Sequence, residues 1–562
     1  MRVIDGAAVI TRVEPQSPAA RAGLRPGFVL RGVDGESMRR VLRLTEHMAA
    51  FQPALRHRAH EEIVVGHLNG PAGTRARVSY TDARGRLRRA SLPRERLRGE
   101  MSPPFQTMPA QFYEFEARRL RGGIGYIRFD VFAAPVMDKF CAAVRSMSDA
   151  PGLVIDLRGN RGGLLGLIYG MAGLLVESRA SFGTMRMRAG AMEFRAFPQR
   201  RPYTGQVVVI IDRASVSASE IFAGGLQDMG RALVVGERSA GMTLPSVARE
   251  LPTGAILQYA FAEFISPRGQ RLEGRGVTPD FPVRLDRRSL LAGRDAQLET
   301  ALDSIDLSPI TDTSASPTAR GGPGDKDEDP DAPVEVVVRL DGADAASQPA
   351  TAAYDPEVER IVAKYEQAVG GREAFERVTS RVSRGTFQGT FADVKINGTV
   401  EILEKAPDSA LQVVEIPGYG RVRRGYNGAY GFEQLPLFGY REFRGMELAE
   451  VRLTSDFRWG VRLRSLYRKM TLAGREKVGG ADAHVVVATP ASGLPARLYF
   501  DAQTGLLVRK DDTYFEDYRE VDGLRLPFLT RGPNFVITLN EVRHNLPLDD
   551  ARFVELKDCF TQ

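Results

Sequence analysis

Two segments of this chain each join an apolar run to a short turn and then to a stretch typical of a helix. In the first, residues 207–211 read Val-Val-Val-Ile-Ile, residues 215–220 read Ser-Val-Ser-Ala-Ser-Glu, and an apolar stretch follows. In the second, residues 153–157 lead into a turn that contains Gly162 and Gly163. Each pattern predicts a buried strand that ends at the N-terminus of a helix.

The first turn supplies a candidate nucleophile, Ser217. A helix N-terminus points free backbone N–H groups at whatever lies beside it, and the paired glycines of the second turn let the backbone approach a substrate closely. A nucleophile and oxyanion donors are two of the three parts that acyl transfer needs. We expect the N–H groups of Gly163 (or Gly162) and Ala218 to hold the oxyanion. Alternatively, Ser217 is only a helix N-cap and the glycines only form a tight turn.

Several ordered blocks between residues 125 and 280 carry a family resemblance. They are Gly125-Tyr-Ile-Arg-Phe, Val154-Ile-Asp-Leu-Arg-Gly-Asn, Ser217-Ala-Ser-Glu, Leu226-Gln-Asp, Val234-Val-Gly-Glu and Gly276-Val-Thr-Pro-Asp. This set resembles the carboxy-terminal processing peptidases, or tail-specific proteases, with their relatives in the tricorn-protease core. The resemblance implies an α/β fold of the ClpP/crotonase type and a polypeptide substrate that is cleaved.

The general base is the missing part. The resemblance implies a lysine 25 residues after the serine, but that position is Met242, which cannot take a proton. Lys139 is the only lysine in the first 305 residues and is expected on a solvated helix face. Tricorn-like relatives use a histidine helped by a glutamate, and Glu273 matches that glutamate, which makes it a candidate catalytic residue.

No histidine of this chain can be assigned as the base from its sequence position. Four lie in the first 67 residues and two near the C-terminus: His47, His57, His60, His67, His484 and His544. The histidine of the tricorn-like relatives precedes the domain with which this chain begins. The chain is therefore expected to be either a truncated Ser-His-Glu enzyme or an inactive relative that binds peptides.

The remaining sequence predicts further domains. Residues 1–98 resemble an N-terminally truncated PDZ domain, a β domain that binds extended peptides by adding a strand to a sheet edge. Residues 99–305 form the protease α/β domain. Residues 306–352, rich in Pro, Ser, Ala, Gly and Asp, predict a disordered linker. Residues 353–562 resemble the LolA-like antiparallel β half-barrel with helices, which implies a pocket for a lipid or other hydrophobic ligand, or alternatively a docking module.

Composition limits the partners. The hydrophobic content of 43% and the net charge of +7 are ordinary for 562 residues, and no basic stripe with interleaved aromatic residues predicts nucleic-acid binding. No apolar run reaches the roughly 18 residues of an integral membrane span. We expect no cofactor and no metal, because no metal-ligand spacing is present. The resemblance places the protein in the periplasm or cell envelope, although no signal peptide begins the sequence.

Three functions are compatible with these observations. The first is a serine endopeptidase with Ser217 as nucleophile and a PDZ-like domain that presents the substrate's tail. The second is a catalytically inactive envelope protein that binds peptides or lipids. The third is a crotonase-type acyl-CoA enzyme, which shares the fold and the paired N–H donors. The Ser217-Ala-Ser-Glu block argues against the third, because that chemistry needs no serine nucleophile.

Overall fold

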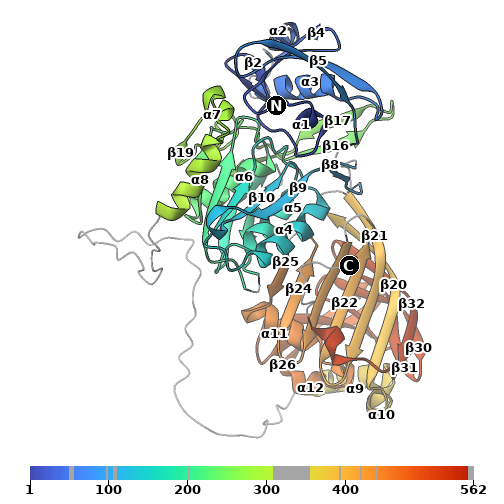
Figure 1. The fold of residues 1–562 in the computed structure, drawn as a ribbon. Coiled ribbons are helices and arrows are strands. Elements are labelled where there is room, and N and C mark those ends of the chain that lie inside the picture. Colours follow the sequence, from blue (N-terminus) through green and yellow to red (C-terminus); the bar gives the residue numbers. More distant parts are fainter. Residues whose placement is uncertain are drawn as a thin grey trace, which may run out of the picture.

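The computed structural model describes residues 1–49, 56–96, 99–104, 110–188, 190–199, 201–307, 355–391, 394–417, 420–436 and 439–554. An N-terminal β domain, a central α/β domain and a C-terminal antiparallel sheet follow one another along the chain (Figure 1). This confirms the predicted fold class. Of the linker expected over 306–352, residues 306–307 end helix α8 (Ala296–Leu307), and the others lie outside the described residues.

The N-terminal domain is a small sheet with three helices. The strand order is β1 (Arg2–Ile4), β2 (Ala7–Val9), β3 (Val29–Val33), β5 (Arg75–Thr81) and β6 (Leu87–Pro93), with β4 (Glu36–Ser37) paired to β3. The helices are α1 (Pro18–Arg21), α2 (Met38–Ala49) and α3 (Arg56–Leu68). The sequence predicted the β5–β6 hairpin from the turn at residues 82–85 and α1 from the short helical stretch at residues 17–24. It did not predict α2 and α3, which bury Met38 and Val64 against the sheet.

The central domain is built on a mostly parallel sheet. Its strand order is β19 (Phe281–Pro282), β15 (Ala232–Gly236), β14 (Gln206–Ile211), β11 (Gly152–Asp156), β10 (Gly125–Phe129) and β9 (Phe115–Arg119). Every neighbouring pair is parallel except β9 with β10. The apolar runs predicted as buried strands are β11 and β14, and their carboxyl ends lie at the same edge of the sheet because they are parallel neighbours.

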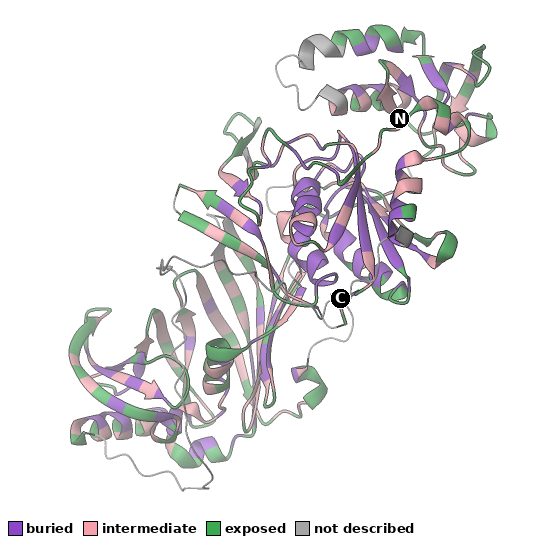
Figure 2. Cartoon of the chain, turned by 90° about the vertical axis from the view of Figure 1, so that its left-hand side faces the viewer, coloured by how far each residue is buried: buried purple, intermediate pink, exposed green. Residues whose placement is uncertain are grey.

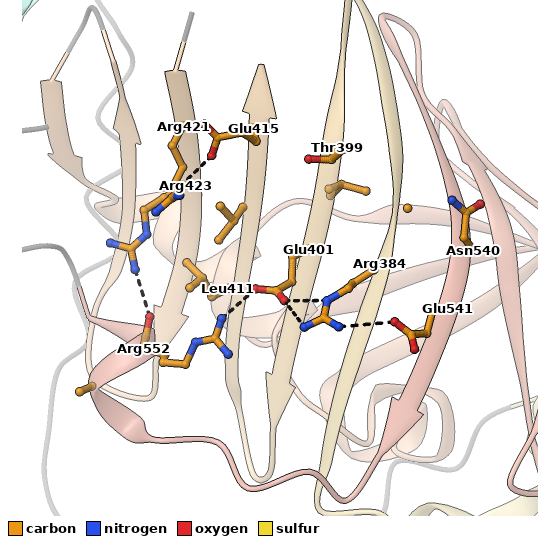
Figure 3. Close-up of a pocket in the computed structure, with 14 residues that line it drawn as sticks. Arg384, Thr399, Glu401, Leu411, Glu415, Arg421, Arg423, Asn540, Glu541 and Arg552 are labelled. Atoms are coloured by element: carbon orange, nitrogen blue, oxygen red, sulfur yellow. Dashed lines mark hydrogen bonds and ion pairs between the residues drawn. The ribbon is translucent and has the colours of Figure 1, made fainter. Parts of the chain in front are cut away.

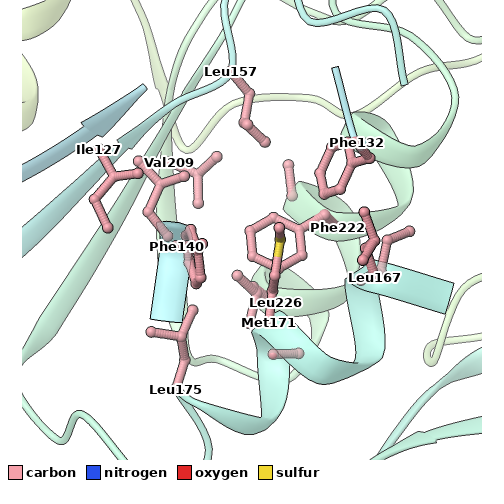
Figure 4. Packing of buried hydrophobic residues seen from close by; sticks show 14 of the residues in the cluster. Ile127, Phe132, Phe140, Leu157, Leu167, Met171, Leu175, Val209, Phe222 and Leu226 are labelled. Atoms are coloured by element: carbon pink, nitrogen blue, oxygen red, sulfur yellow. The ribbon is translucent and has the colours of Figure 1, made fainter. Parts of the chain in front are cut away.

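Helices cover both faces of this sheet. One face packs against α4 (Ala134–Ser146), α5 (Leu165–Gly173) and α6 (Ala218–Asp228), and the other packs against α8. Figure 2 shows that burial is concentrated in this domain. Phe222 of α6 is fully buried at the centre of an aromatic cluster (Figure 4), with ring centroids 5.9 Å from Phe132, 6.5 Å from Phe140 and 6.4 Å from Phe182.

Smaller elements surround the central sheet. They are the pair β7 (Glu100–Met101) and β8 (Phe112–Tyr113), the sheet of β12 (Ala180–Met187), β13 (Gly190–Ala196) and β18 (Ala262–Ile265), the hairpin β16 (Ser246–Glu250) and β17 (Ile256–Ala260), and helix α7 (Arg287–Leu291). None of the helices in the described ranges is long and apolar enough to cross a membrane.

The C-terminal sheet contains 13 antiparallel strands in the order β25-β24-β23-β22-β21-β20-β32-β31-β30-β29-β28-β27-β26. Their bounds are β20 (Ser380–Phe391), β21 (Val394–Lys405), β22 (Ser409–Ile416), β23 (Gly420–Asn427), β24 (Gly431–Leu435), β25 (Gly439–Glu442), β26 (Tyr467–Val478), β27 (Ala481–Pro490), β28 (Ala496–Asp501), β29 (Leu507–Lys510), β30 (Thr513–Val521), β31 (Leu524–Arg531) and β32 (Phe535–His544). The helices are α9 (Pro356–Ala368), α10 (Gly371–Glu376), α11 (Gly445–Thr454) and α12 (Leu463–Leu466).

One expected strand of this sheet was wrong. The alternating pattern of residues 518–526 predicts a single strand, whereas the structure divides them between β30 and β31. The turn lies at Asp522 and Gly523, whose φ angles are 50° and 81°. An Asp-Gly pair with two positive φ angles is the signal of a tight two-residue hairpin turn.

The edge strand β25 contacts the central domain. Gln199, which is 7% exposed, donates from Nε2 to the Tyr440 carbonyl oxygen at 2.9 Å and accepts the Tyr440 N–H at 2.8 Å through Oε1. The Arg441 guanidinium lies 5.7 Å from the ring centroid of Phe197. The Gln199 amide thus forms with Tyr440 the pair of backbone hydrogen bonds that a neighbouring strand would otherwise form.

The aromatic cluster makes a stability prediction. We expect Phe222→Ala to lower the free energy of unfolding by about 3–5 kcal/mol, because it leaves a cavity among three rings. Phe281→Ala is the matched control, since Phe281 is 40% exposed in the same domain, and we expect it to cost less than about 1 kcal/mol. Chemical denaturation of the full chain measures both. Equal losses for the two variants would contradict the assignment of α6 to the core.

Candidate active site

Ser217 lies between β14 and the first turn of α6 in an unusual backbone conformation. Its φ is 58° and its ψ is −120°, which a residue with a Cβ atom rarely adopts and which costs on the order of 1–3 kcal/mol. Such a conformation persists only where its surroundings hold it. The Ser217 N–H donates to the Glu220 Oε2 atom and to the Met242 carbonyl oxygen, both at 2.9 Å.

The carboxylate of Glu220 joins this turn to the loop of residues 239–242. Glu220 is fully buried. Besides the Ser217 N–H it accepts the N–H of Gly241 at 2.6 Å, the N–H of Met242 at 2.9 Å and the hydroxyl of Ser239 at 2.7 Å. Burial raises the pKa of Glu220 above its ordinary value, although these four hydrogen bonds favour the ionised form. The sequence motif predicted no role for Glu220. Its Ser-x-x-Glu spacing, that of a capping box, indicates the hydrogen bond to the Ser217 N–H, but not the bonds to the loop of residues 239–242.

The glycine turn faces Ser217 at close range. A Cβ atom on Gly162 would lie 2.7 Å from the Ser217 Cβ and 3.0 Å from the Ala218 nitrogen, and one on Gly163 would lie 2.5 Å from the Phe132 carbonyl oxygen. The φ angles of Gly162 and Gly163 are 73° and 136°. Only glycine fits this turn, because both the backbone conformation and the space exclude a side chain.

Asn160 holds the glycine turn against the Ser217 turn. Its Oδ1 accepts the Gly162 N–H at 2.9 Å, its Nδ2 donates to the Phe129 carbonyl, and its own carbonyl accepts the Val216 N–H at 3.1 Å. The Gly162 N–H is thus already used. Within the described part of the chain, the N–H groups of Gly163 and Ala218 have no hydrogen-bond partner.

Glu273 lies on the other side of the Met242 loop. Its Oε2 accepts the N–H of Thr243 at 2.6 Å and the N–H of Leu244 at 3.1 Å. Among the described residues, its Oε1 has no hydrogen-bond partner. The backbone of Met242 therefore stands between the Glu220 and Glu273 carboxylates, directly beside Ser217.

Lys139 and the histidines considered as possible bases belong to other elements than the turns around Ser217. Lys139 of α4 forms an ion pair with Glu100 at 2.9 Å. His67 lies on α3 and contacts the Ile63 carbonyl oxygen. In the C-terminal sheet, His484 belongs to β27, and His544 of β32 contacts Asp522 at 2.9 Å. His60 lies on α3, and the side chains of His47 and His57 are outside the described residues.

The charged residues at the end of β11 form a structural network. Asp156 is fully buried and accepts hydrogen bonds from Tyr126 at 2.8 Å and from the guanidinium of Arg158 at 2.6 Å. Although burial opposes ionisation, Arg158 and Arg128 hold the pKa of Asp156 far below its usual value. Arg158 also binds Asp295 at 2.9 Å, just before α8. This network fixes the strand end without reaching Ser217.

The Glu220 hydrogen bonds predict a measurable cost of removing them. Glu220→Ala leaves the N–H groups of Gly241 and Met242 and the Ser239 hydroxyl without an acceptor, whereas the Ser217 N–H keeps the Met242 carbonyl oxygen. We expect a loss of about 3–5 kcal/mol in the free energy of unfolding. Glu220→Gln keeps one oxygen and is expected to lose about 1–3 kcal/mol. Urea denaturation of both variants tests this. Glu237→Ala is the control, because Glu237 pairs with Arg213 at a partly exposed position. A Glu220→Ala variant as stable as that control would contradict the assignment.

Comparison with known proteins agrees with these features. Residues 123–283 match the model of peptidase family S41, and residues 9–65 match the model of a PDZ domain. The carboxy-terminal processing protease CtpB of Bacillus subtilis is 26% identical over 284 residues, which are 50% of this chain and 53% of that protein. The carboxyl-terminal-processing protease of Picosynechococcus sp. is 32% identical over 188 residues, which are 32% of this chain and 45% of that protein.

The chain spans about half the length of these curated relatives. A solved structure of a photosystem II D1 C-terminal processing protease has a TM-score of 0.33 and 24% identity, over 54% of this chain and 73% of that one. Residues 123–283 of this chain thus match peptidase family S41 and residues 9–65 match a PDZ domain, which confirms the resemblance found in its motifs.

Proposed function

We propose that this protein is a serine peptidase that cleaves polypeptides with Ser217 as its nucleophile. One observation supports this most directly. Ser217 is held in a costly backbone conformation beside two N–H groups, those of Gly163 and Ala218, that bind nothing else in the described residues. Strained nucleophiles beside free donors are typical of acyl-transfer sites, because the donors can stabilise a developing oxyanion.

The proposed reaction uses these groups in order. The Ser217 hydroxyl attacks the peptide carbonyl and gives up its proton, and the carbonyl oxygen becomes an oxyanion bound by the Gly163 and Ala218 N–H groups. Collapse of the tetrahedral intermediate breaks the peptide C–N bond and leaves an acyl-enzyme, which water then hydrolyses. Gly162 shapes the site but does not donate, because Asn160 takes its N–H.

Proton transfer requires a base that Met242 cannot be. We propose that Glu273 orients an imidazole, since its Oε2 is fixed by two backbone N–H groups while its Oε1 remains open among the described residues. An imidazole held in this way would take the Ser217 proton and later return it to the leaving amine. This assignment follows the tricorn-like resemblance rather than the lysine-dependent one.

We propose that the PDZ domain presents the substrate's tail. The periplasmic or envelope location rests on the family resemblance alone and is proposed with it. A hollow of about 1320 Å³ separates the PDZ domain from the S41 domain and is lined by Leu24, Leu30 and Val78 on one side and by Phe115 and Phe129 on the other. Charged side chains, among them Arg12, Glu14 and Asp130, also line the hollow, and an extended peptide fits a cleft of this mixed character. The alternative is a peptide-binding protein without turnover, which the methionine at position 242 favours.

Active-site labelling separates these two proposals. A peptidase requires that a fluorophosphonate labels Ser217 and that Ser217→Ala lowers casein hydrolysis by more than about a thousandfold. Ser246→Ala, in the exposed hairpin β16–β17, is the control and should leave both unchanged. Absence of both labelling and hydrolysis supports the binding protein, because a serine without a base reacts poorly with a fluorophosphonate. Hydrolysis that survives Ser217→Ala would exclude Ser217 as the nucleophile.

A lysine at position 242 is expected to remain ineffective. The Met242 backbone lies between the Glu220 and Glu273 carboxylates, and neighbouring negative charges raise a lysine pKa and keep it protonated. We expect Met242→Lys to label no faster than Met242→Leu at neutral pH. The rate of fluorophosphonate labelling measures this. A labelling rate raised about tenfold or more by lysine alone would show that this site belongs to the lysine-dependent branch.

A further inference from the structure

The C-terminal sheet has a charged hollow of about 920 Å³ on one face (Figure 3). It lies against β20 to β23 and β32 and is bordered by the 3-10 helix η4 (Asp550–Phe553) near the end of the chain. Four arginines and three glutamates line it: Arg384, Arg421, Arg423, Arg552, Glu401, Glu415 and Glu541. The hollow therefore carries one more positive than negative charge.

Three of the four arginines have carboxylate partners. Arg384 pairs with Glu401 at 2.9 Å and with Glu541 at 3.5 Å. Arg552 also pairs with Glu401, at 2.7 Å, and Arg421 pairs with Glu415 at 2.8 Å. The excess charge of the hollow therefore lies on the remaining arginine, Arg423.

Arg423 is buried, and none of the described carboxylates pairs with it. It is 6% exposed, and its Nη2 donates to the carbonyl oxygens of Arg552 and Val554, each at 3.1 Å. It forms no ion pair with the part of the chain that the structure describes, and its Nη1 is buried without a hydrogen-bond partner. The opposing residue on β24 is Gln434, also 6% exposed, whose Oε1 is buried and unpartnered too.

This arrangement is unfavourable in the empty state. Burial lowers the pKa of Arg423, and the like charges of Arg421 and Arg552 lower it further. A buried charge without a counter-charge destabilises a protein. The two carbonyl oxygens bound to Nη2 and the Phe432 ring, whose centroid lies 5.8 Å from the guanidinium, offset only part of this cost. An anion that accepts a hydrogen bond from the unpartnered Nη1 would remove the imbalance of charge.

We propose that this hollow binds a carboxylate carried on an apolar body, with the Arg423 Nη1 as its charged donor. One net positive charge suits a singly charged group, whereas a dianion such as phosphate would be repelled by the three glutamates. Leu411 and Val413 line the hollow beside Arg423 and suit an apolar body. A half-turn of the Gln434 amide would present its nitrogen as a second donor. This proposal does not depend on Ser217.

Two sources share this chemistry: a fatty acid and the free carboxyl end of an apolar peptide. The test is isothermal titration calorimetry of the full chain with octanoate and with a blocked apolar tripeptide that has a free carboxyl end. Octanamide and the tripeptide amide are the neutral partners. We expect one carboxylate to bind, and its neutral partner to bind at least about tenfold more weakly, because a charge-assisted hydrogen bond is lost.

Matched variants locate the binding. Arg423→Met is expected to weaken the binding of the carboxylate at least about tenfold. Arg421→Met removes a charge that is already paired in the same hollow, and it should change the affinity for the carboxylate less than about threefold. If Arg423→Met does not fold, Gln434→Leu takes its place. Binding of neither carboxylate, equal binding of the neutral partners, or full binding by Arg423→Met would overturn the proposal. A crystal soaked with octanoate that shows only a bridging water between Arg423 and Gln434 would overturn it as well.

Discussion

The buried carboxylate of Glu220 is the interaction on which the rest of the site depends. It accepts hydrogen bonds from Ser217 at the start of α6 and from three residues of the 239–242 loop. A single carboxylate therefore holds the strained Ser217 backbone and brings Met242 against it. Because hydrogen bonds to a buried charge are stronger than those between neutral groups, this one group can offset the cost of the strained conformation.

The parallel sheet brings the glycine turn after β11 close to the Ser217 turn after β14. The neighbouring strands β11 and β14 end at the same edge, so the turns that follow them meet there. Asn160 then locks the two turns together by binding the Gly162 N–H with its side chain and the Val216 N–H with its carbonyl. Two N–H groups, those of Gly163 and Ala218, stay without a partner among the described residues, and we propose that they bind the oxyanion. The structure thus separates the Gly162 N–H, which Asn160 binds, from the N–H groups of Gly163 and Ala218, and the sequence motif does not make this distinction.

The sequence predicted the features that depend on local pattern. Apolar runs located β11 and β14, and the glycine pair and Ser217 located the turns after them, because strand and turn signals lie in neighbouring residues. Glu220 was missed because its hydrogen bonds reach a loop about 20 residues away, and no local pattern records that contact. The choice between Gly162 and Gly163 also required the structure, since it depends on where the Asn160 side chain points. In the C-terminal sheet, the two unpaired groups of Arg423 and Gln434 arise from strand pairing, which alternation alone does not fix.

The central claim is that Ser217 and the two open N–H groups form one acyl-transfer site. A crystal structure of the full chain treated with a peptidyl phosphonate tests it most directly. The account predicts a bond from phosphorus to the Ser217 Oγ, with the phosphonyl oxygen within hydrogen-bond distance, about 2.7–3.1 Å, of both the Gly163 and Ala218 nitrogens. An adduct on another residue, or a phosphonyl oxygen turned to solvent away from both nitrogens, would contradict it.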